Sequence, residues 1–329
     1  MISKSLQFAL LLLTFFNYIN GNHLELSDSE FLEKLKNDYL NENGSAIVGK
    51  ECSMVGNEQE CLFISDVLQF SENGKWSINR YASKHEDISL GFVTYSRLVT
   101  PEWQTLENLD TKNWEVDVSV VFDKMVNGLE IILPFQYGYL PLTQSMDKHF
   151  TILGVATAGF MSFIANRFEN IKMTGIDIDD KTERVSREWF GYDCEKEKCE
   201  LLIEDGVDFV ADMARIGAKT SAIFIDACLN QVQPGWICPV SSFLSTSFLN
   251  NLSTILDING FVIINTLFHP FDDKNYDNFV EKLEKHFANC QLHHLEKQYN
   301  KMIICANFTP KMPKYRESMK FLANIGVIF

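Results

Sequence analysis

Residues 150–178 read FTILGVATAGFMSFIANRFENIKMTGIDI, and this stretch decides the fold. Its apolar start at residues 150–154 predicts a strand, which leads through a turn of small residues into a helix that ends near Arg167. A second apolar run at residues 173–178 predicts the next strand. A helix of this length between two strands indicates a right-handed parallel crossover, so the stretch predicts one βαβ unit of an α/β sheet.

The same alternation continues toward the C-terminus and predicts a doubly wound sheet. Only a few polar residues separate the last two strands, which indicates an antiparallel hairpin at one end of that sheet. In chain order the remaining predicted elements are a helix at 181–190, a strand at 201–203, a helix at 207–215, a strand at 222–225, a helix at 242–256, a strand at 261–265, a helix at 276–287, and strands at 292–295 and 302–308.

The chain before residue 150 has a less regular pattern. A helix is predicted at residues 26–40, opened by Ser27 or Ser29, and short β-like runs follow at residues 91–98, 116–121 and 129–133. Gly, Asn and Pro separate these runs. We therefore predict four parts: a signal peptide at 1–21, a small β-rich domain at 22–149, the α/β domain at 150–310, and a tail or helix at 311–329.

The first 21 residues have the layout of a signal peptide. Lys4 precedes an apolar run at residues 6–16, and a polar stretch at residues 17–22 follows. This run is too short to cross a hydrocarbon core of ~30 Å as a helix, so a cleaved signal is favoured over a permanent anchor, which remains the alternative. We expect a protein that is secreted or lies in the lumen of the secretory pathway, without a stable membrane span.

Cysteines and glycosylation sequons are consistent with that route. The chain has eight cysteines, and in an oxidising compartment an even number favours disulfides, with buried free thiols as the alternative. Zinc is disfavoured because there is no C-x-x-C and no His at finger spacing, and we predict no metal site. Neighbours in sequence are Cys52 with Cys61, Cys194 with Cys199, Cys228 with Cys238, and Cys290 with Cys305; the sequons lie at Asn43, Asn251 and Asn307.

The charge balance restricts the partners. The chain carries 29 Lys and Arg against 44 Asp and Glu, a net charge of −15 at pH 7. Phosphate binding requires clustered cations, so we expect no nucleic-acid partner and no general binding to anionic membranes. With 46% hydrophobic residues the chain can bury a substantial core. The sequence leaves a homodimer open.

Candidate site residues stand at the predicted strand ends, because ligands of open α/β sheets lie beyond the carboxyl ends of the strands. Gly154 opens a small-residue turn that lets the backbone approach a ligand, and Asp177, about twenty residues on, can accept hydrogen bonds from both ribose hydroxyls. Asp205, followed by Gly206, can hold an adenine amino group, and Asp226 ends the fourth strand. An Asp after a strand is otherwise a helix cap or turn residue. Together the positions favour an adenosine-containing ligand.

Seven further segments carry a resemblance to a known family. The region from residue 151 to about 308 resembles the spermidine-synthase-like S-adenosylmethionine-dependent methyltransferases, in particular the C-terminal domain of the elongation factor 1A lysine and N-terminal methyltransferases. A WFG triplet after the acidic second strand and a CP pair before a phenylalanine-rich helix are unusual among general methyltransferases. The segments are GIDIDD (175–180), REWFG (187–191), EDGVDFV (204–210), IFIDA (223–227), CP (238–239), SSFLSTSFL (241–249) and GFVIIN (260–265).

The resemblance implies a seven-stranded class I methyltransferase sheet, which is Rossmann-like, behind the small β-rich N-terminal domain. It implies S-adenosylmethionine as cofactor and a methyl acceptor that is a protein or a small molecule. By position, Asp226 would face the transfer site, and the cofactor would be held by Gly154, Ala156, Asp177, Asp205 and Gly206.

Departures from the family pattern leave alternatives open. Ala156, Thr157 and Ala158 stand where the family has glycines, and each added Cβ can block a positive φ or crowd the cofactor, so a pseudoenzyme that serves as a secreted binding or structural module is the alternative. Asp226 is followed by ACLN instead of the S-S-D of aminopropyltransferases, and the first turn lacks an acid, which argues against polyamine synthesis. A dehydrogenase would match the degenerate G-x-A-x-x-G turn but not the WFG and CP segments.

Overall fold

The computed structural model describes residues 26–55, 58–71, 73–102, 104–195, 197–229, 233–294 and 299–329. The predicted signal peptide lies outside these residues and stays a prediction. Within the described ranges, no helix combines the length and the apolar character that crossing a membrane requires.

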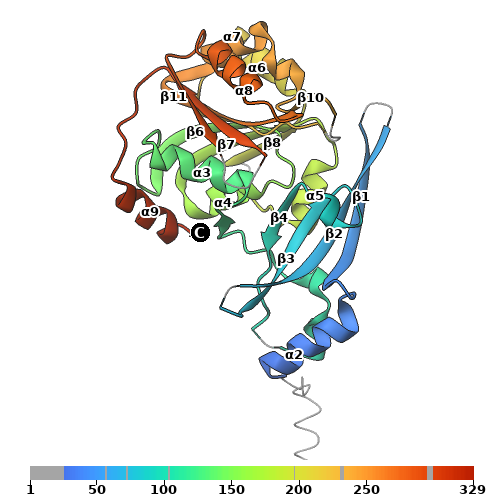
Figure 1. Cartoon of the computed structure of the whole chain (residues 1–329). Coiled ribbons are helices and arrows are strands. Elements are labelled where there is room, and N and C mark those ends of the chain that lie inside the picture. The colour runs from blue at the N-terminus through green and yellow to red at the C-terminus, as the bar shows by residue number, and fades with distance from the viewer. Residues whose placement is uncertain are drawn as a thin grey trace, which may run out of the picture.

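A large sheet dominates the C-terminal part of the chain (Figure 1). Its strands are β6 Ser145–Leu153, β7 Glu169–Asp177, β8 Cys199–Ile203, β9 Thr220–Ile225, β11 Leu256–His269, β12 Asn289–His294 and β13 Lys301–Ala306. Among the described residues they lie in the order β12-β13-β11-β9-β6-β7-β8. The last five of these run parallel, whereas β13 is antiparallel to both of its neighbours. The predicted doubly wound sheet and its terminal antiparallel hairpin are therefore confirmed. A short strand, β10 (Gly235–Cys238), pairs with the end of β11.

Helices cover both faces of this sheet (Figure 1). One face packs against α3 Val126–Gln136, α4 Gly159–Arg167 and α9 Tyr315–Asn324. The other packs against α6 Gly206–Ile216, α7 Thr246–Ile255 and α8 Asp273–Leu283.

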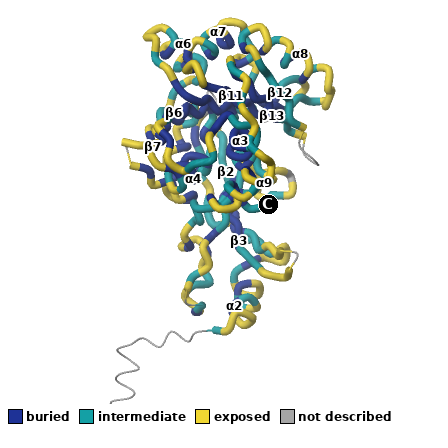
Figure 2. Tube along the Cα trace, turned by 90° about the vertical axis from the view of Figure 1, so that its left-hand side faces the viewer, coloured by how far each residue is buried: buried dark blue, intermediate teal, exposed yellow. Residues whose placement is uncertain are grey.

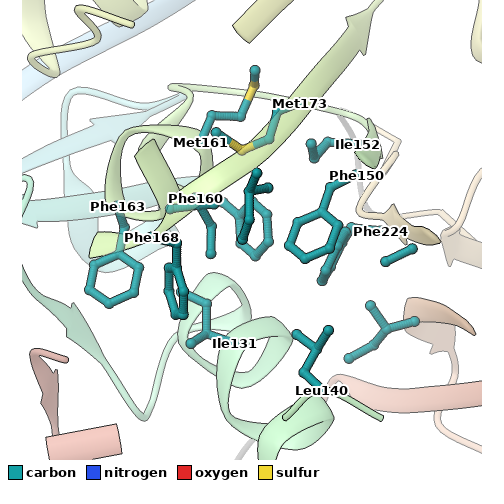
Figure 3. Packing of buried hydrophobic residues seen from close by; sticks show 14 of the residues in the cluster. Ile131, Leu140, Phe150, Ile152, Phe160, Met161, Phe163, Phe168, Met173 and Phe224 are labelled. Carbon is teal, nitrogen blue, oxygen red and sulfur yellow. The ribbon is translucent and has the colours of Figure 1, made fainter. Parts of the chain in front are cut away.

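Strand side chains alternate between the two cores, as the pleat requires. In β9, Phe224 lies in the first core and Ile223 and Ile225 lie in the second. Figure 3 shows Phe224 beside Phe150 of β6, with Ile131 of α3 nearby. Because both faces are covered, the central strands are buried along their length, whereas the outer faces of the helices are exposed (Figure 2).

An antiparallel sheet forms most of the N-terminal part. Its strands follow chain order: β1 Ser45–Val55, β2 Glu58–Phe70, β3 Trp76–Ser83 and β4 Thr94–Arg97. Strand β4 lies within the predicted run at 91–98, whereas the sequence did not predict β1 to β3. The run at 116–121 contains only a bridge from Leu98 to Val116 and the start of β5 (Val121–Phe122), which pairs with β14 (Val327–Ile328).

The predicted helix at 26–40 is observed in two segments. Helix α2 (Asp28–Lys34) is capped by Ser27, whose side chain accepts from the Glu30 backbone while the Glu30 side chain accepts from the Ser27 backbone. A π-helical segment, Leu35–Tyr39, continues it. The predicted N-terminal cap is therefore confirmed.

The strand predicted at residues 129–133 is wrong, because these residues lie in α3. A short apolar run without alternation fits a buried helix as well as a strand, and only tertiary packing distinguishes them. Here Ile131, Ile132 and Phe135 are buried against the large sheet. The helix therefore belongs to the core of the sheet although it precedes the predicted boundary at residue 150.

The N-terminal sheet is docked onto α5 (Thr182–Trp189) by close packing and a buried ion pair. A Cβ at Gly49 would lie 2.4 Å from the Trp189 ring, so only glycine allows this approach. The guanidinium of Arg80 makes two 2.8 Å contacts with the carboxylate of Asp66 and donates to the Trp189 carbonyl at 3.3 Å. Because Arg80 and Asp66 are both buried, this contact fixes the sheet beside α5.

All four predicted cysteine pairs are disulfides in the structure. The alternative of buried free thiols is therefore wrong, and no free cysteine occurs in the described part of the chain. Two of the bonds join neighbouring strands: Cys52 to Cys61 across β1 and β2, and Cys290 to Cys305 across β12 and β13.

Candidate functional site

The predicted site residues meet at one edge of the large sheet. Gly154 follows β6, Asp177 ends β7, Asp205 follows β8, and Asp226 follows β9. These strands are neighbours in the order β9-β6-β7-β8, so their carboxyl ends form one continuous edge. The strand pairing continues into it: the Gly154 amide donates to the Ile176 carbonyl at 2.9 Å, and the Asp226 amide donates to the Leu153 carbonyl at 2.9 Å.

The turn after β6 has a backbone conformation that favours glycine. Gly154 has φ 89°, and both Ala156 and Ala158 have φ 54°. The sequence raised the expectation that added Cβ atoms would block such angles, yet both alanines adopt the left-handed region, where an L-residue costs about 1–2 kcal/mol. Gly154 itself cannot be replaced, because a Cβ there would lie 2.5 Å from the Asp226 carbonyl oxygen.

Asp177 is engaged by its own chain. Its Oδ2 accepts from the amides of Val155 and Ala156 at 2.9 and 3.1 Å, and its Oδ1 accepts from the Asp179 amide at 3.0 Å. A carboxylate has about four acceptor positions, so one remains on Oδ1. The sequence predicted that Asp177 would accept from two ribose hydroxyls, but the structure leaves room for one unless an amide is released.

Asp205 caps helix α6. Its Oδ1 accepts from the Val207 amide at 2.7 Å, which is the helix-cap role that the sequence left as the alternative. The side chain is exposed, and its second oxygen has no hydrogen bond among the described residues. Gly206 begins the helix beneath the ring of Phe243, 3.1 Å from the position of a Cβ. Asp205 therefore keeps one oxygen for a ligand while it holds the helix start.

Asp226 begins a chain of side-chain hydrogen bonds. Its Oδ1 accepts from Asn265 Nδ2 at 2.6 Å, and Asn265 Oδ1 accepts from Asn300 Nδ2 at 2.8 Å. Burial raises the pKa of Asp226 to about 6, and the Asn265 hydrogen bond lowers it in part. This carboxylate can therefore gain or lose a proton close to neutral pH.

A second carboxyl group, Glu130 of α3, faces Asp226 and was missed by the sequence reasoning. Its side chain is only 3% exposed, and its Oε1 has no hydrogen-bond partner among the described residues. Burial and the Asp226 charge raise the pKa of Glu130 well above its usual value. A lone carboxylate inside the apolar run LEIILPF was the signal that could have identified it.

The N-terminal sheet also reaches this edge. Ser53 of β1 donates to Asp179 Oδ1 at 2.7 Å and accepts from Lys181 Nζ at 2.9 Å, and Lys181 also contacts Asp179 directly. Lys84 lies beside this group; burial lowers the pKa of Lys84 to about 8, although Glu60 raises it. The sequence did not connect these residues because more than a hundred positions separate Ser53 from Asp179.

One solved structure superposes on most of this chain. A probable spermidine synthase from Corynebacterium glutamicum superposes with a TM-score of 0.54 at 12% identity, over 84% of this chain and 86% of that one. The chain therefore has the fold of this spermidine-synthase structure. The likeness includes the N-terminal sheet, because it extends well beyond the α/β domain. No protein-family profile matches the chain.

Curated relatives confirm the resemblance seen in the sequence. The chain is 25% identical over 183 residues to the eEF1A lysine and N-terminal methyltransferase homolog of Drosophila melanogaster, and 24% identical over 157 residues to the human eEF1A lysine and N-terminal methyltransferase. These matches cover 56% and 47% of this chain but only 26% and 22% of the relatives. The chain thus spans about a quarter of the length of the curated relatives it matches.

Proposed function

We propose that this chain is an S-adenosylmethionine-dependent, methyltransferase-like protein that is secreted or lies in the lumen of the secretory pathway. It binds its cofactor at the carboxyl edge of β6 to β9. The fold and the curated methyltransferase relatives support the reaction class. The four disulfides support an oxidising compartment.

The turn after β6 is the observation that carries this proposal. It keeps the left-handed backbone that suits glycine even where alanines occupy it, at Ala156 and Ala158. The carboxylates of Asp177 and Asp205 then keep acceptor positions for an adenosine moiety. The residues present therefore fit the cofactor, with the small residues Gly154, Ala156 and Gly206 at the same edge of the sheet.

When bound, S-adenosylmethionine supplies a methyl group on a sulfonium centre. The chain contributes alignment, because direct methyl transfer depends on orientation more than on covalent chemistry. Asp226, held by Asn265, is the carboxylate placed to orient the acceptor and to take a proton from it. Glu130 lies beside it, and burial and the Asp226 charge raise the pKa of Glu130 well above its usual value. The net charge of −15 makes nucleic acid an unfavourable acceptor.

The pseudoenzyme remains the second candidate, and the hydrogen bonds of Asp177 favour it. In this structure the carboxylate stabilises the turn with three amides of its own chain. A protein that had lost its cofactor would retain such contacts for folding alone. A secretory compartment would also have to import the cofactor, which likewise favours the pseudoenzyme.

Calorimetric titration of the secreted protein with S-adenosylmethionine and S-adenosylhomocysteine distinguishes the two. A charge-assisted hydrogen bond contributes about 1.5–3 kcal/mol, so Asp177→Ala should weaken binding by roughly 10- to 100-fold. Asp177→Asn keeps an acceptor oxygen for the Val155 and Ala156 amides and should weaken binding less. Asp212→Ala, which removes an exposed carboxylate on α6, is the matched control and should bind like the native protein.

Glycine substitution tests the turn itself. Replacing Ala156 and Ala158 with glycine should tighten binding, because the two methyl groups that restrict the left-handed turn are removed. A protein that binds neither ligand before or after these substitutions is the pseudoenzyme. Tight native binding that Asp177→Ala leaves unchanged would show that the ribose is held elsewhere.

A further inference from the structure

A cluster of metal-type ligands lies at the foot of the candidate site. The ligand atoms of Asp226, Cys228 and Cys238 all lie within 4.8 Å of one another. Cys228 Sγ is 3.4 Å from Asp226 Oδ1, and Cys238 is 3% exposed. In the structure the two sulfurs are joined as a disulfide. A disulfide sulfur carries no proton, so its contact with Asp226 is not a hydrogen bond.

The spacing agrees with a tetrahedral centre. With metal–sulfur and metal–oxygen bonds of about 2.3 and 2.1 Å, an oxygen and a sulfur ligand stand roughly 3.6 Å apart, and two sulfurs roughly 3.8 Å. The observed distance from Asp226 Oδ1 to Cys228 Sγ is 3.4 Å. Only the two sulfurs must separate from their bonded distance. Cys228 follows β9, and Cys238 ends β10.

Among the described residues, no basic side chain affects the pKa of the two carboxyl groups beside this cluster. Glu130 is 97% buried beside Asp226, given its 3% exposure, and its Oε1 has no partner among the described residues. Among the described residues, Asp226 accepts a hydrogen bond from the neutral amide of Asn265, and its Oδ1 lies 3.4 Å from the disulfide sulfur of Cys228. A divalent cation bound beside Asp226 would compensate the charge of this carboxylate.

We propose that reduction of the Cys228–Cys238 disulfide opens a zinc-type metal site formed by Asp226, Cys228 and Cys238. A dithiol reductant gives two electrons to the disulfide and becomes a disulfide itself, leaving two protein thiols. A divalent metal ion then binds both thiolates with release of two protons. Three protein ligands leave one position of the tetrahedron for solvent or for Glu130. A small-molecule disulfide that takes up two electrons and becomes two thiols closes the Cys228–Cys238 bond again and expels the ion, so the redox state of the compartment controls occupancy.

This inference rests on the ligand geometry and not on methyl transfer, and its test does not use the cofactor. The full chain is titrated with Co²⁺, whose thiolate charge-transfer absorption reports sulfur ligation, with and without prior reduction. Reduced protein should bind one Co²⁺ that Zn²⁺ displaces, and oxidised protein should bind none. Cys238→Ser should lower the affinity of the reduced protein at least tenfold. The paired substitution Cys290→Ser with Cys305→Ser opens a different disulfide and should leave the Co²⁺ site unchanged.

A second variant keeps the test valid if full reduction unfolds the chain. Cys228→His leaves the Cys238 thiol free and supplies an imidazole ligand while the other three disulfides remain closed. This variant should bind Co²⁺ without reductant, and adding Asp226→Ala should weaken that binding. The proposal is overturned if neither the reduced native protein nor Cys228→His binds the metal, or if binding persists without Cys238.

Discussion

Ala156→Gly should stabilise the protein, because the native backbone at this position suits glycine. Ala156 has φ 54°, and an L-residue there costs about 1–2 kcal/mol. Glycine also increases the conformational entropy of the unfolded chain, which lowers the free energy of unfolding by about 0.4–1 kcal/mol. The Ala156 methyl group is partly exposed, so its loss costs only part of the ~0.8 kcal/mol of a buried methylene. The net expectation is a gain of about 0.5 kcal/mol.

Two matched variants give the expected order. Ala158 has the same φ of 54° but is 1% exposed, so the lost methyl contact offsets the relieved strain and Ala158→Gly should be close to neutral. Ala211 lies in the middle of α6, where glycine costs about 1 kcal/mol. Urea midpoints, compared at equal denaturant slopes, should therefore rank Ala156→Gly above the native protein and Ala211→Gly below it.

The free energies of unfolding of Ala156→Gly and Ala211→Gly should differ by about 1.5 kcal/mol, and this difference decides the test. If the two variants lost the same stability, the left-handed turn would carry no strain that glycine relieves. Alanine at position 156 would then adopt the left-handed conformation without a cost in stability. An altered denaturant slope would instead show that the substitution changed the compactness of one state, and the midpoints would have to be compared by thermal unfolding.

Two further outcomes follow from the described groups. Asp226→Asn should stabilise the protein by an amount that grows between about pH 4 and pH 6, reaching on the order of 2 kcal/mol. Burial raises the pKa of Asp226 to about 6, so the native state retains a proton that the unfolded state releases, and the native protein loses stability as pH rises. Unfolding measured across this pH range checks the prediction, with Glu188→Gln at an exposed position as the control. A difference in stability that does not change with pH would contradict it. Expressed in secreting cells, the protein should reach the medium with a start near Asn22 and should lose mass on glycosidase treatment, since Asn43 and Asn307 are exposed; cytosolic retention without a mass change would remove the secretory proposal.

The α/β part of the fold could be predicted from sequence because its signals are local. Each central strand is a short run buried on both faces, so apolar residues such as Ile223, Phe224 and Ile225 follow one another. The N-terminal strands lack that signal. The side chains of β1 and β4 are largely half-buried, and β1 carries Glu51 and Cys52 in its middle, so its pattern depends on the cross-strand partners in β2.

The candidate site likewise contains residues that could be predicted from sequence and residues that could not. Topology places Gly154, Asp177 and Asp226 at one edge once the strand order is known; the alternation of elements predicts the parallel sheet but not that order. Glu130 and Ser53 could not be placed, because α3 and β1 reach the edge through contacts distant in sequence. The disulfide pairs could be predicted because the partners lie within fifteen residues of each other in the sequence.

The chain and an adenosine ligand compete for the same carboxylates. Asp177 already accepts three amides, and Asp205 already caps α6, so a ligand that needs both ribose contacts must release one amide of the first turn. A net hydrogen bond contributes about 1 kcal/mol, which corresponds to roughly fivefold in affinity. The turn is thus stabilised in the ligand-free protein by contacts that a ligand partly replaces. Weak binding that is insensitive to Asp177→Asn but lost in Asp177→Ala would identify Asp177 as the support of the turn and not as the ribose ligand.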